Sequence, residues 1–352
     1  MLRFSVIFVV IYILLTSCSQ GMKGRLLTSF DIGTNTNNIL LWISYGGSNY
    51  IFQSYQDFLS SSVDRSVKTY LDDNFFLPFH SVNQEVWLVN QIRQQIRILN
   101  SSQDKVVNVK ELTLKSESLI QDVVLNQYKS MMILMLENIL PSDYFVNSIA
   151  FLRESSNSLE NHTYNLTNVF KIETDDEGNF YVFQMPDDNE IRIDVFSPSF
   201  IPVVSRNVKV YEIVSSNFVF SSVVVTKPYT ILFKFDSLEN QQKGEIFSFD
   251  INLNKFSKKY EVVLPRENFQ MLSYLRNGFV ACATYKGNLP TVMFFDPSSP
   301  SFKVSHEIYI DFQYPLMMRG FKVDRSGKII AMFADFPDNR VLFYYWDLIS
   351  AR

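Results

Sequence analysis

The chain has 352 residues, 47% of them hydrophobic, which is ample for a folded core. Its 32 Phe and 18 Tyr favour strands over helices. The formal net charge of −4, which becomes −5 without a leader that carries only Arg3, excludes the basic surface that nucleic-acid binding requires. Two cysteines are too few for a disulfide scaffold or a Cys-rich metal site. We therefore expect an all-β protein with no nucleic-acid partner and no cofactor.

The first 17 residues have the features of a signal peptide. Arg3 is followed by an apolar run over residues 4–15, and small residues come after it. This run is shorter than the roughly 20 residues that a membrane-spanning helix needs. We predict that residues 1–17 are removed after export.

The sequence Leu15-Thr16-Ser17-Cys18 resembles the lipobox of bacterial lipoproteins, and its Thr and Ser are similar to those in spirochaete-type lipoproteins. The resemblance implies cleavage before Cys18, lipidation of this residue and a membrane anchor in the bacterial cell envelope, at the outer membrane. An ordinary secretory signal and an uncleaved anchor are the alternatives. Residues 18–25 are predicted to be the lipidated cysteine and a polar tether. No linker interrupts the sequence beyond this tether, so we predict one domain over residues 26–352.

A unit of two strands and two turns, over residues 174–196, recurs along the chain. In this unit an acidic turn closed by Gly178 precedes the aromatic run 180–183, and a second polar turn precedes residues 191–196. Ile191, Ile193 and Val195 alternate with polar residues, which is typical of a half-buried strand.

Seven segments resemble the last strand of this unit, and their first β-branched residues are separated by 42 to 57 residues. The segments begin at residues 38, 95, 148, 190, 245, 291 and 340. A period of about 40 to 50 residues with about four strands per repeat is typical of β-propeller blades. We predict a β-propeller of seven blades, with six or eight as alternatives, and a pair of β-sandwiches as the competing fold.

Two distant copies of the unit match best. Residues 170–183 and 321–333 both begin with Phe-Lys and a β-branched residue, and both continue into an Asp-x-x-Gly turn. Such a turn joins neighbouring strands in NHL-like and related propeller blades, which these two copies resemble. The run Met131-Met-Ile-Leu-Met-Leu136 is predicted to be a fully buried strand, because six residues are too few for a typical helix.

The two ends of the predicted domain are expected to meet. The chain ends at Arg352, six residues after the strand candidate 340–346, which leaves no sequence for an outermost strand of the last blade. Residues 26–31 form a strand candidate with no blade ahead of it. We predict that this segment pairs with the last blade, closes the disc and covers an exposed edge.

Few residues suggest chemistry. His80, His162 and His306 are far apart and form no metal-ligand motif, so we expect surface or structural roles. Cys282 lies in an apolar run and is predicted to be a buried strand thiol rather than a nucleophile. The common hydrolase and nucleotide-binding motifs do not occur. We predict no catalytic, metal-binding or cofactor-binding residue, and lipidation of Cys18 is the one predicted modification.

A calcium loop is a weaker alternative for the acidic turn. Glu173, Asp175 and Glu177 match its first positions, but Gln184 stands where a bidentate Glu is required. We therefore expect a hairpin turn.

Two further patterns concern loops. The glycosylation triplets at Asn100, Asn161 and Asn165 would be inert in a bacterial lipoprotein and are typical of polar loops. Aromatic residues near expected turns could line a face of the disc; they are Tyr45, Tyr144, Phe145, Tyr285 and Tyr314.

Two classes of function fit these features. The first is a membrane-anchored binding module without enzymatic activity, which presents loops to a protein or glycan. The second is a propeller hydrolase of the lactonase type, with a metal held in the central channel by converging carboxylates and amides. No set of acidic positions recurs from blade to blade, so the binding module is preferred. A subunit of an assembly machinery is a third alternative.

Overall fold

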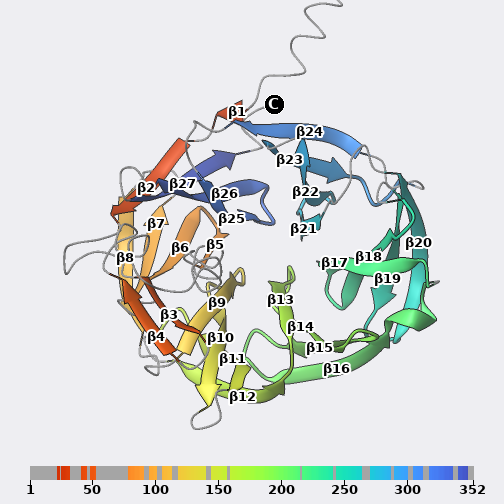
Figure 1. Cartoon of the computed structure of the whole chain (residues 1–352), viewed down its shortest axis with the longest axis horizontal. Helices are drawn as coiled ribbons and strands as arrows, with labels where there is room; N and C mark the ends of the chain where they lie inside the picture. Colours follow the sequence, from red (N-terminus) through yellow and green to blue (C-terminus); the bar gives the residue numbers. More distant parts are fainter. Residues whose placement is uncertain are drawn as a thin grey trace, which may run out of the picture.

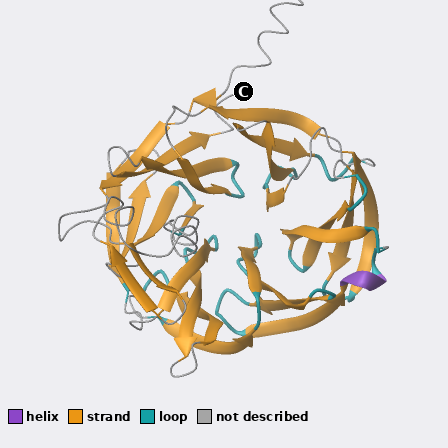
Figure 2. Ribbon diagram, viewed as in Figure 1, coloured by secondary structure: helices purple, strands orange, loops and turns teal. Residues whose placement is uncertain are grey.

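The computed structural model describes residues 22–23, 25–31, 41–45, 48–52 and, with short gaps, 78–347. Within these ranges the chain forms 27 strands and a single turn of 3₁₀ helix, Val210–Glu212. No helix of this part is long and apolar enough to cross a bilayer. Figure 2 shows how completely strands dominate, with the helical turn at the rim. The all-β prediction is confirmed, and the predicted signal peptide and Cys18 lie outside the described residues.

Six sheets contain four or five strands each among the described residues, and they follow one another in chain order. Their members are, for sheet 1, β5 (Phe79–Val82), β6 (Glu85–Asn90), β7 (Gln95–Asn100) and β8 (Lys105–Glu111); for sheet 2, β9 (Ser118–Leu125), β10 (Met131–Ile139), β11 (Tyr144–Leu152) and β12 (Glu160–Leu166); for sheet 3, β13 (Val169–Thr174), β14 (Phe180–Asp187), β15 (Glu190–Phe196) and β16 (Pro202–Lys209).

The other three sheets continue the pattern, and two of them include strands from the start of the chain. Their members are, for sheet 4, β17 (Phe218–Lys227), β18 (Thr230–Ser237), β19 (Lys243–Asp250) and β20 (Lys255–Val263); for sheet 5, β21 (Gln270–Tyr274), β22 (Val280–Lys286), β23 (Leu289–Phe295), β24 (Val304–Asp311) and β1 (Met22–Lys23); for sheet 6, β25 (Met317–Val323), β26 (Lys328–Asp335), β27 (Arg340–Asp347) and β2 (Arg25–Asp31).

The sheets are arranged around a central space (Figure 1). The first strand of each sheet is nearest the centre, and the fourth strand is at the rim. Neighbours within each sheet are antiparallel, apart from the parallel pair of β1 and β24. This is the arrangement of a β-propeller.

The period read from the sequence corresponds to one structural position. Six of the seven segments are the third strands of the six sheets: β7, β11, β15, β19, β23 and β27. The first segment differs. Its described part is β3 (Leu41–Tyr45), which pairs only with β4 (Ser48–Phe52) in a two-stranded sheet. Both are strands, as expected, but among the described residues this segment does not occupy the third position of a four-stranded sheet.

The hydrophobic core lies between adjacent sheets rather than at the centre of the ring. One cluster joins sheets 3 and 4 through Tyr181, Phe183, Val223 and Phe233, and similar clusters join the other neighbouring pairs from sheet 1 to sheet 6. Phe79 of sheet 1 meets Phe343 of sheet 6 edge to face, with 5.6 Å between ring centroids. Both faces of most strands are therefore buried.

This packing explains why two strand predictions differ in outcome. The run 131–135 in β10 is fully buried, as predicted. In β15, Ile191 and Ile193 alternate with partly exposed neighbours, but Asp194, Val195 and Phe196 are all buried. The half-buried pattern holds only for the first half of β15, because its second half is covered on both faces by neighbouring sheets.

The segment from the start of the chain pairs as the sequence predicts. Strand β2 is antiparallel to β27, with Arg25 opposite Tyr345 and Asp31 opposite Arg340. It is the fourth strand of sheet 6, beside β27. Strand β1 adds to the outer edge of sheet 5, with Met22 opposite Ile310.

Candidate functional site

The centre of the ring contains a cavity of about 780 Å³. Its wall is formed by residues from the first strands of all six sheets, β5, β9, β13, β17, β21 and β25, and by the turns that follow them. We call this cavity the central channel. Its size lies within the range of about 300 to 1,000 Å³ that is typical of small-molecule sites.

Each first strand ends in a tight turn, and two of these turns are the predicted Asp-x-x-Gly turns. The Asp175 carboxylate accepts hydrogen bonds from the backbone N–H of Glu177 and Asn179, both at 2.9 Å. Asp324 accepts the equivalent bonds from Ser326 and Lys328, also at 2.9 Å. These bonds satisfy the donors exposed where the chain reverses, and they fix each turn.

Glycine is required at the fourth position of the first turn. Gly178 has a φ of +86°, and a Cβ there would lie 2.8 Å from the ring of Tyr128. The second Asp175 oxygen accepts hydrogen bonds from Asn179 Nδ2 at 2.8 Å and from the Tyr181 hydroxyl at 2.6 Å. The hairpin turn is therefore confirmed, and both carboxylate oxygens of Asp175 are occupied within it.

A third turn has the same geometry without the sequence motif. Asn126 replaces the aspartate, and its Oδ1 accepts from the N–H of Tyr128 and Ser130, both at 3.0 Å. Lys129 occupies the glycine position with a φ of +57°. The Asp-x-x-Gly signal therefore underestimates how often this turn occurs.

Basic side chains cross the channel and tie distant sheets together. Lys322 of sheet 6 donates to Asp122 and, at 3.0 Å, to the carbonyl of Val123, both in sheet 2. Lys171 of sheet 3 donates to the carbonyl of Val223 in sheet 4 and, at 3.4 Å, approaches that of Leu272 in sheet 5. The inner strands have free edge carbonyls because no further strand pairs with them, and these lysines supply donors for them.

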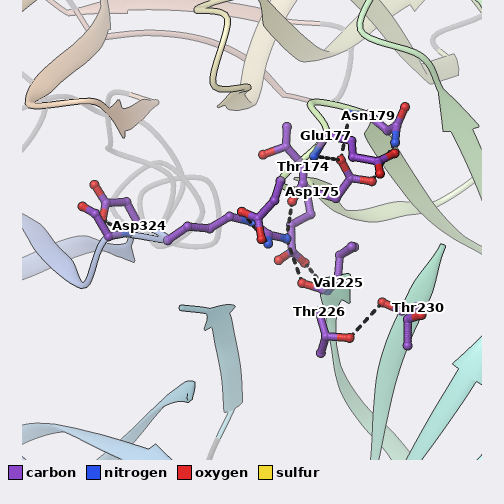
Figure 3. Close-up of polar contacts among 12 residues, drawn as sticks. Thr174, Asp175, Glu177, Asn179, Val225, Thr226, Thr230 and Asp324 are labelled. Carbon is purple, nitrogen blue, oxygen red and sulfur yellow. Dashed lines mark hydrogen bonds and ion pairs between the residues drawn. The ribbon is translucent and has the colours of Figure 1, made fainter. Parts of the chain in front are cut away.

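Arg325 connects three sheets. Figure 3 shows Asp324 set apart from Thr174 and Val225 across the channel, and Arg325 follows Asp324 in the chain. Its Nη2 donates to the carbonyls of Thr174, at 2.5 Å, and Val225, at 2.8 Å. Its Nη1 forms an ion pair with Asp176, at 3.3 Å. Arg325 thus connects sheet 6 to sheets 3 and 4.

Acidic and hydroxyl groups add links between neighbouring sheets. Glu173 accepts from the N–H of Val225 at 3.1 Å and forms an ion pair with Lys171 at 3.2 Å. The Ser81 hydroxyl of sheet 1 donates to Asp324 of sheet 6 at 2.7 Å. Lys171, Glu173 and Asp324 are therefore held in place by bonds within the channel wall.

His80 is the histidine of the channel wall. Burial, followed by the nearby positive charge of Lys322, lowers the pKa of His80 to about 3. Its Nδ1 atom is buried and has no hydrogen-bond partner among the described residues. The imidazole is therefore neutral at physiological pH.

The low pKa predicts that acid destabilises the protein through His80. An unfolded histidine titrates near pH 6.5, so the contribution to stability is complete above that pH and is lost as the pH falls toward 3, because only the unfolded chain takes up the proton. Urea unfolding of the wild type should give a lower free energy of unfolding at pH 5 than at pH 7. In His80→Gln this difference between the two pH values should be smaller by roughly 1 to 2 kcal/mol. An identical loss of stability between pH 7 and pH 5 in the wild type and in His80→Gln would contradict the low pKa of His80.

The other residues considered from the sequence are not brought together. His162 and His306 lie on the fourth strands of sheets 2 and 5, away from β5. Cys282 is fully buried in β22, as predicted, and burial raises the pKa of its thiol. Gln184 hydrogen-bonds to Asp194 at 2.5 Å, which gives it a role within sheet 3. Among the described residues, no three His, Cys, Asp or Glu side chains form a group that could hold a metal ion.

The prediction that the glycosylation triplets lie in loops needs correction. The glycosylation triplets begin within strands, with Asn100 in β7 and Asn161 and Asn165 in β12. The aromatic residues expected near turns lie at or close to strand ends where described: Tyr45 ends β3, Tyr144 and Phe145 begin β11, and Tyr285 is next to the end of β22. The strands are longer than the apolar runs because backbone pairing continues into polar sequence. Tyr314 lies outside the described residues.

No protein-family model matches the chain, and no curated protein sequence matches it. Solved structures with a similar fold include the Nup133 β-propeller domain of Vanderwaltozyma polyspora, at 12% identity over 93% of each chain and a TM-score of 0.41. The Dos1 propeller is 13% identical over 78% of this chain and 73% of its own, with a TM-score of 0.40. Puromycin hydrolase is 12% identical over 78% of this chain and 44% of its own, with a TM-score of 0.48. At these values the functions of those proteins are not transferred to this chain.

Proposed function

We propose that the chain is a β-propeller binding module, held at the bacterial envelope by a lipid on Cys18, which binds its ligand without converting it. The observation that supports binding is the central channel, a cavity of about 780 Å³ lined by all six sheets. Its charged side chains are fixed by bonds such as those from Arg325 to Thr174 and Val225. A site that is already ordered loses little conformational entropy when a ligand binds.

We also propose the number of blades and the way in which the ring closes. Six blades correspond to the six sheets, and β2 closes the ring by completing the last blade. The antiparallel pairing of β2 with β27 supports this closure, and the contact between Phe79 and Phe343 supports direct packing of sheet 1 on sheet 6. Closure removes a free sheet edge that would otherwise pair with other chains.

The alternative is a lactonase-type hydrolase with a metal in the channel. This activity would need carboxylates that converge on one point with their oxygens available. In the channel wall, Asp122 is bonded to Lys322, Glu173 to Lys171 and the N–H of Val225, and Asp175 to its own turn. These pairings favour a structural role for the acids, and therefore the binding module.

The anchor and the binding role can be tested with the intact lipoprotein. Fatty acid label should enter the wild type and should be absent from Cys18→Ala, because the thiol is the predicted acceptor. The wild type, cross-linked in its own envelope, should then capture a ligand in a saturable manner, and an excess of the Cys18→Ala protein should compete for it.

Two results would contradict this proposal. Label that persists on Cys18→Ala would exclude the lipid anchor. Turnover of lactones that depends on an added divalent metal would exclude a purely binding role. Lys243→Gln, which replaces an exposed lysine at the start of β19, serves as the control for changes in surface charge.

A further inference from the structure

Two buried nitrogen atoms in the channel wall have no hydrogen-bond partner among the described residues. They are Nδ1 of His80 and Nη1 of Arg325. Both residues line the central channel. Burying a polar group without a partner costs about 1 to 3 kcal/mol, so such groups are rare in folded proteins. Nη1 of Arg325 has only its ion pair with Asp176, at 3.3 Å, and Nδ1 of His80 has no acceptor, so a bound group can complete the hydrogen bonds of both.

Further positive charge lies at the same end of the channel. Arg276 lines it from the turn after β21, and Lys328 lines it from the start of β26; the N–H of Arg276 donates to the carbonyl of Arg325 at 2.8 Å. No side-chain partner is found for Arg276 or Lys328 among the described residues. These two residues therefore place unpaired cationic groups beside the two buried nitrogens.

The acidic residues nearby are mostly occupied. Both oxygens of Asp324 accept hydrogen bonds, from its own turn and from Ser81. Asp176 forms the ion pair with Arg325 but is 42% exposed in its side chain, so it can swing into solvent. A ligand with a negative group can take its place at Nη1.

We propose that the turn end of the central channel binds a small molecule through an oxyanion group, a carboxylate or a phosphate, with Arg325, Arg276 and His80 as its ligands. Arginine is suited to this role because its planar fork matches the geometry of both anions. A neutral imidazole can carry its proton on Nδ1 and donate it to the anion. Lys328 adds positive charge at the same mouth. This inference rests on the proposed binding function and names the chemical class of the ligand.

The histidine rings provide a direct test, because the chain has three histidines. Ring NMR spectra of the full-length Cys18→Ala protein would be recorded at constant pH and ionic strength during titration with inorganic phosphate, with succinate and with neutral succinamide. The His80 signal is assigned by its loss in His80→Gln. We expect it to shift to saturation with phosphate or succinate, and the more effective anion distinguishes the two sources. Succinamide should have no effect.

Two variants check the role of the turn cations. Arg276→Gln should weaken anion binding about fivefold without affecting the fold, because its side chain is exposed and makes no described contact. Lys243→Gln removes an exposed charge on sheet 4 and should leave the affinity unchanged within about twofold.

Absence of a saturable His80 shift, an equal response to succinamide, or unchanged affinity in Arg276→Gln would each overturn the proposal. The titration requires neither a lipid anchor nor an envelope partner, so its failure is distinct from a failure of ligand capture by the lipoprotein.

Discussion

A chain that starts at residue 33 is expected to melt about 5 °C or more below one that starts at residue 19. The shorter chain lacks β1 and β2, which pair with β24 and β27. Without β2, the edge of β27 loses its backbone partners along six residues, Arg340 to Tyr345, and the last sheet keeps three of its four strands. The loss should amount to several kcal/mol, and each kcal/mol lowers the melting temperature by roughly 2 °C in a domain of this size.

The measurement is thermal unfolding of both chains, followed by circular dichroism. A chain that starts at residue 22 is the matched control, because it lacks only residues ahead of β1. It should melt at the same temperature as the chain that starts at residue 19. If the chain that starts at residue 33 melts within about 1 to 2 °C of the control, β2 does not close the ring.

The period of the repeats is readable from sequence because the third strands share one environment. Each contributes buried side chains to the clusters between sheets, so each needs a run of β-branched and aromatic residues of similar length. Strand β3 has such a run, Leu41 to Ile43, and pairs only with β4. An apolar run specifies a strand but not its partner, because pairing depends on residues far away in the chain.

The Asp-x-x-Gly motif identifies only some of the turns that share its hydrogen bonds. The Asp and Gly of 175–178 reveal their turn, whereas Asn126 and Lys129 make the same bonds and give no recognisable signal. An amide oxygen accepts the same two N–H groups as a carboxylate, and a lysine at positive φ is uncommon but allowed.

One sequence pattern could have pointed to the basic residues that line the central channel. Lys171 and Lys322 occupy the same position in the two best-matching copies, directly after a Phe. A lysine repeated at the same position of two first strands indicates a shared role. Its acceptors, Asp122 and the carbonyl of Val223, could not be predicted because they belong to other sheets. Contacts between sheets that are distant in the chain are not encoded by a local sequence pattern.

Replacement of Arg325 by alanine is expected to lower the free energy of unfolding by about 2 to 3 kcal/mol. The variant removes two charge-assisted hydrogen bonds, to the carbonyls of Thr174 and Val225, together with the ion pair to Asp176. Bonds to a charged donor contribute roughly 1.5 to 3 kcal/mol each, and water in the cavity can replace part of the loss. Because these bonds join sheet 6 to sheets 3 and 4, their removal weakens the ring as a whole.

Urea unfolding of the wild type and two variants provides the measurement. Arg276→Ala is the matched control, since it removes an arginine from the neighbouring turn whose side chain makes no described contact, and it should change stability by at most about 0.5 kcal/mol. Equal stabilities for Arg325→Ala and Arg276→Ala would show that the arginine does not brace the channel. A larger effect of Arg325→Ala, with an unchanged slope against urea concentration, would show that the link stabilises the folded ring and leaves the unfolded chain unaltered.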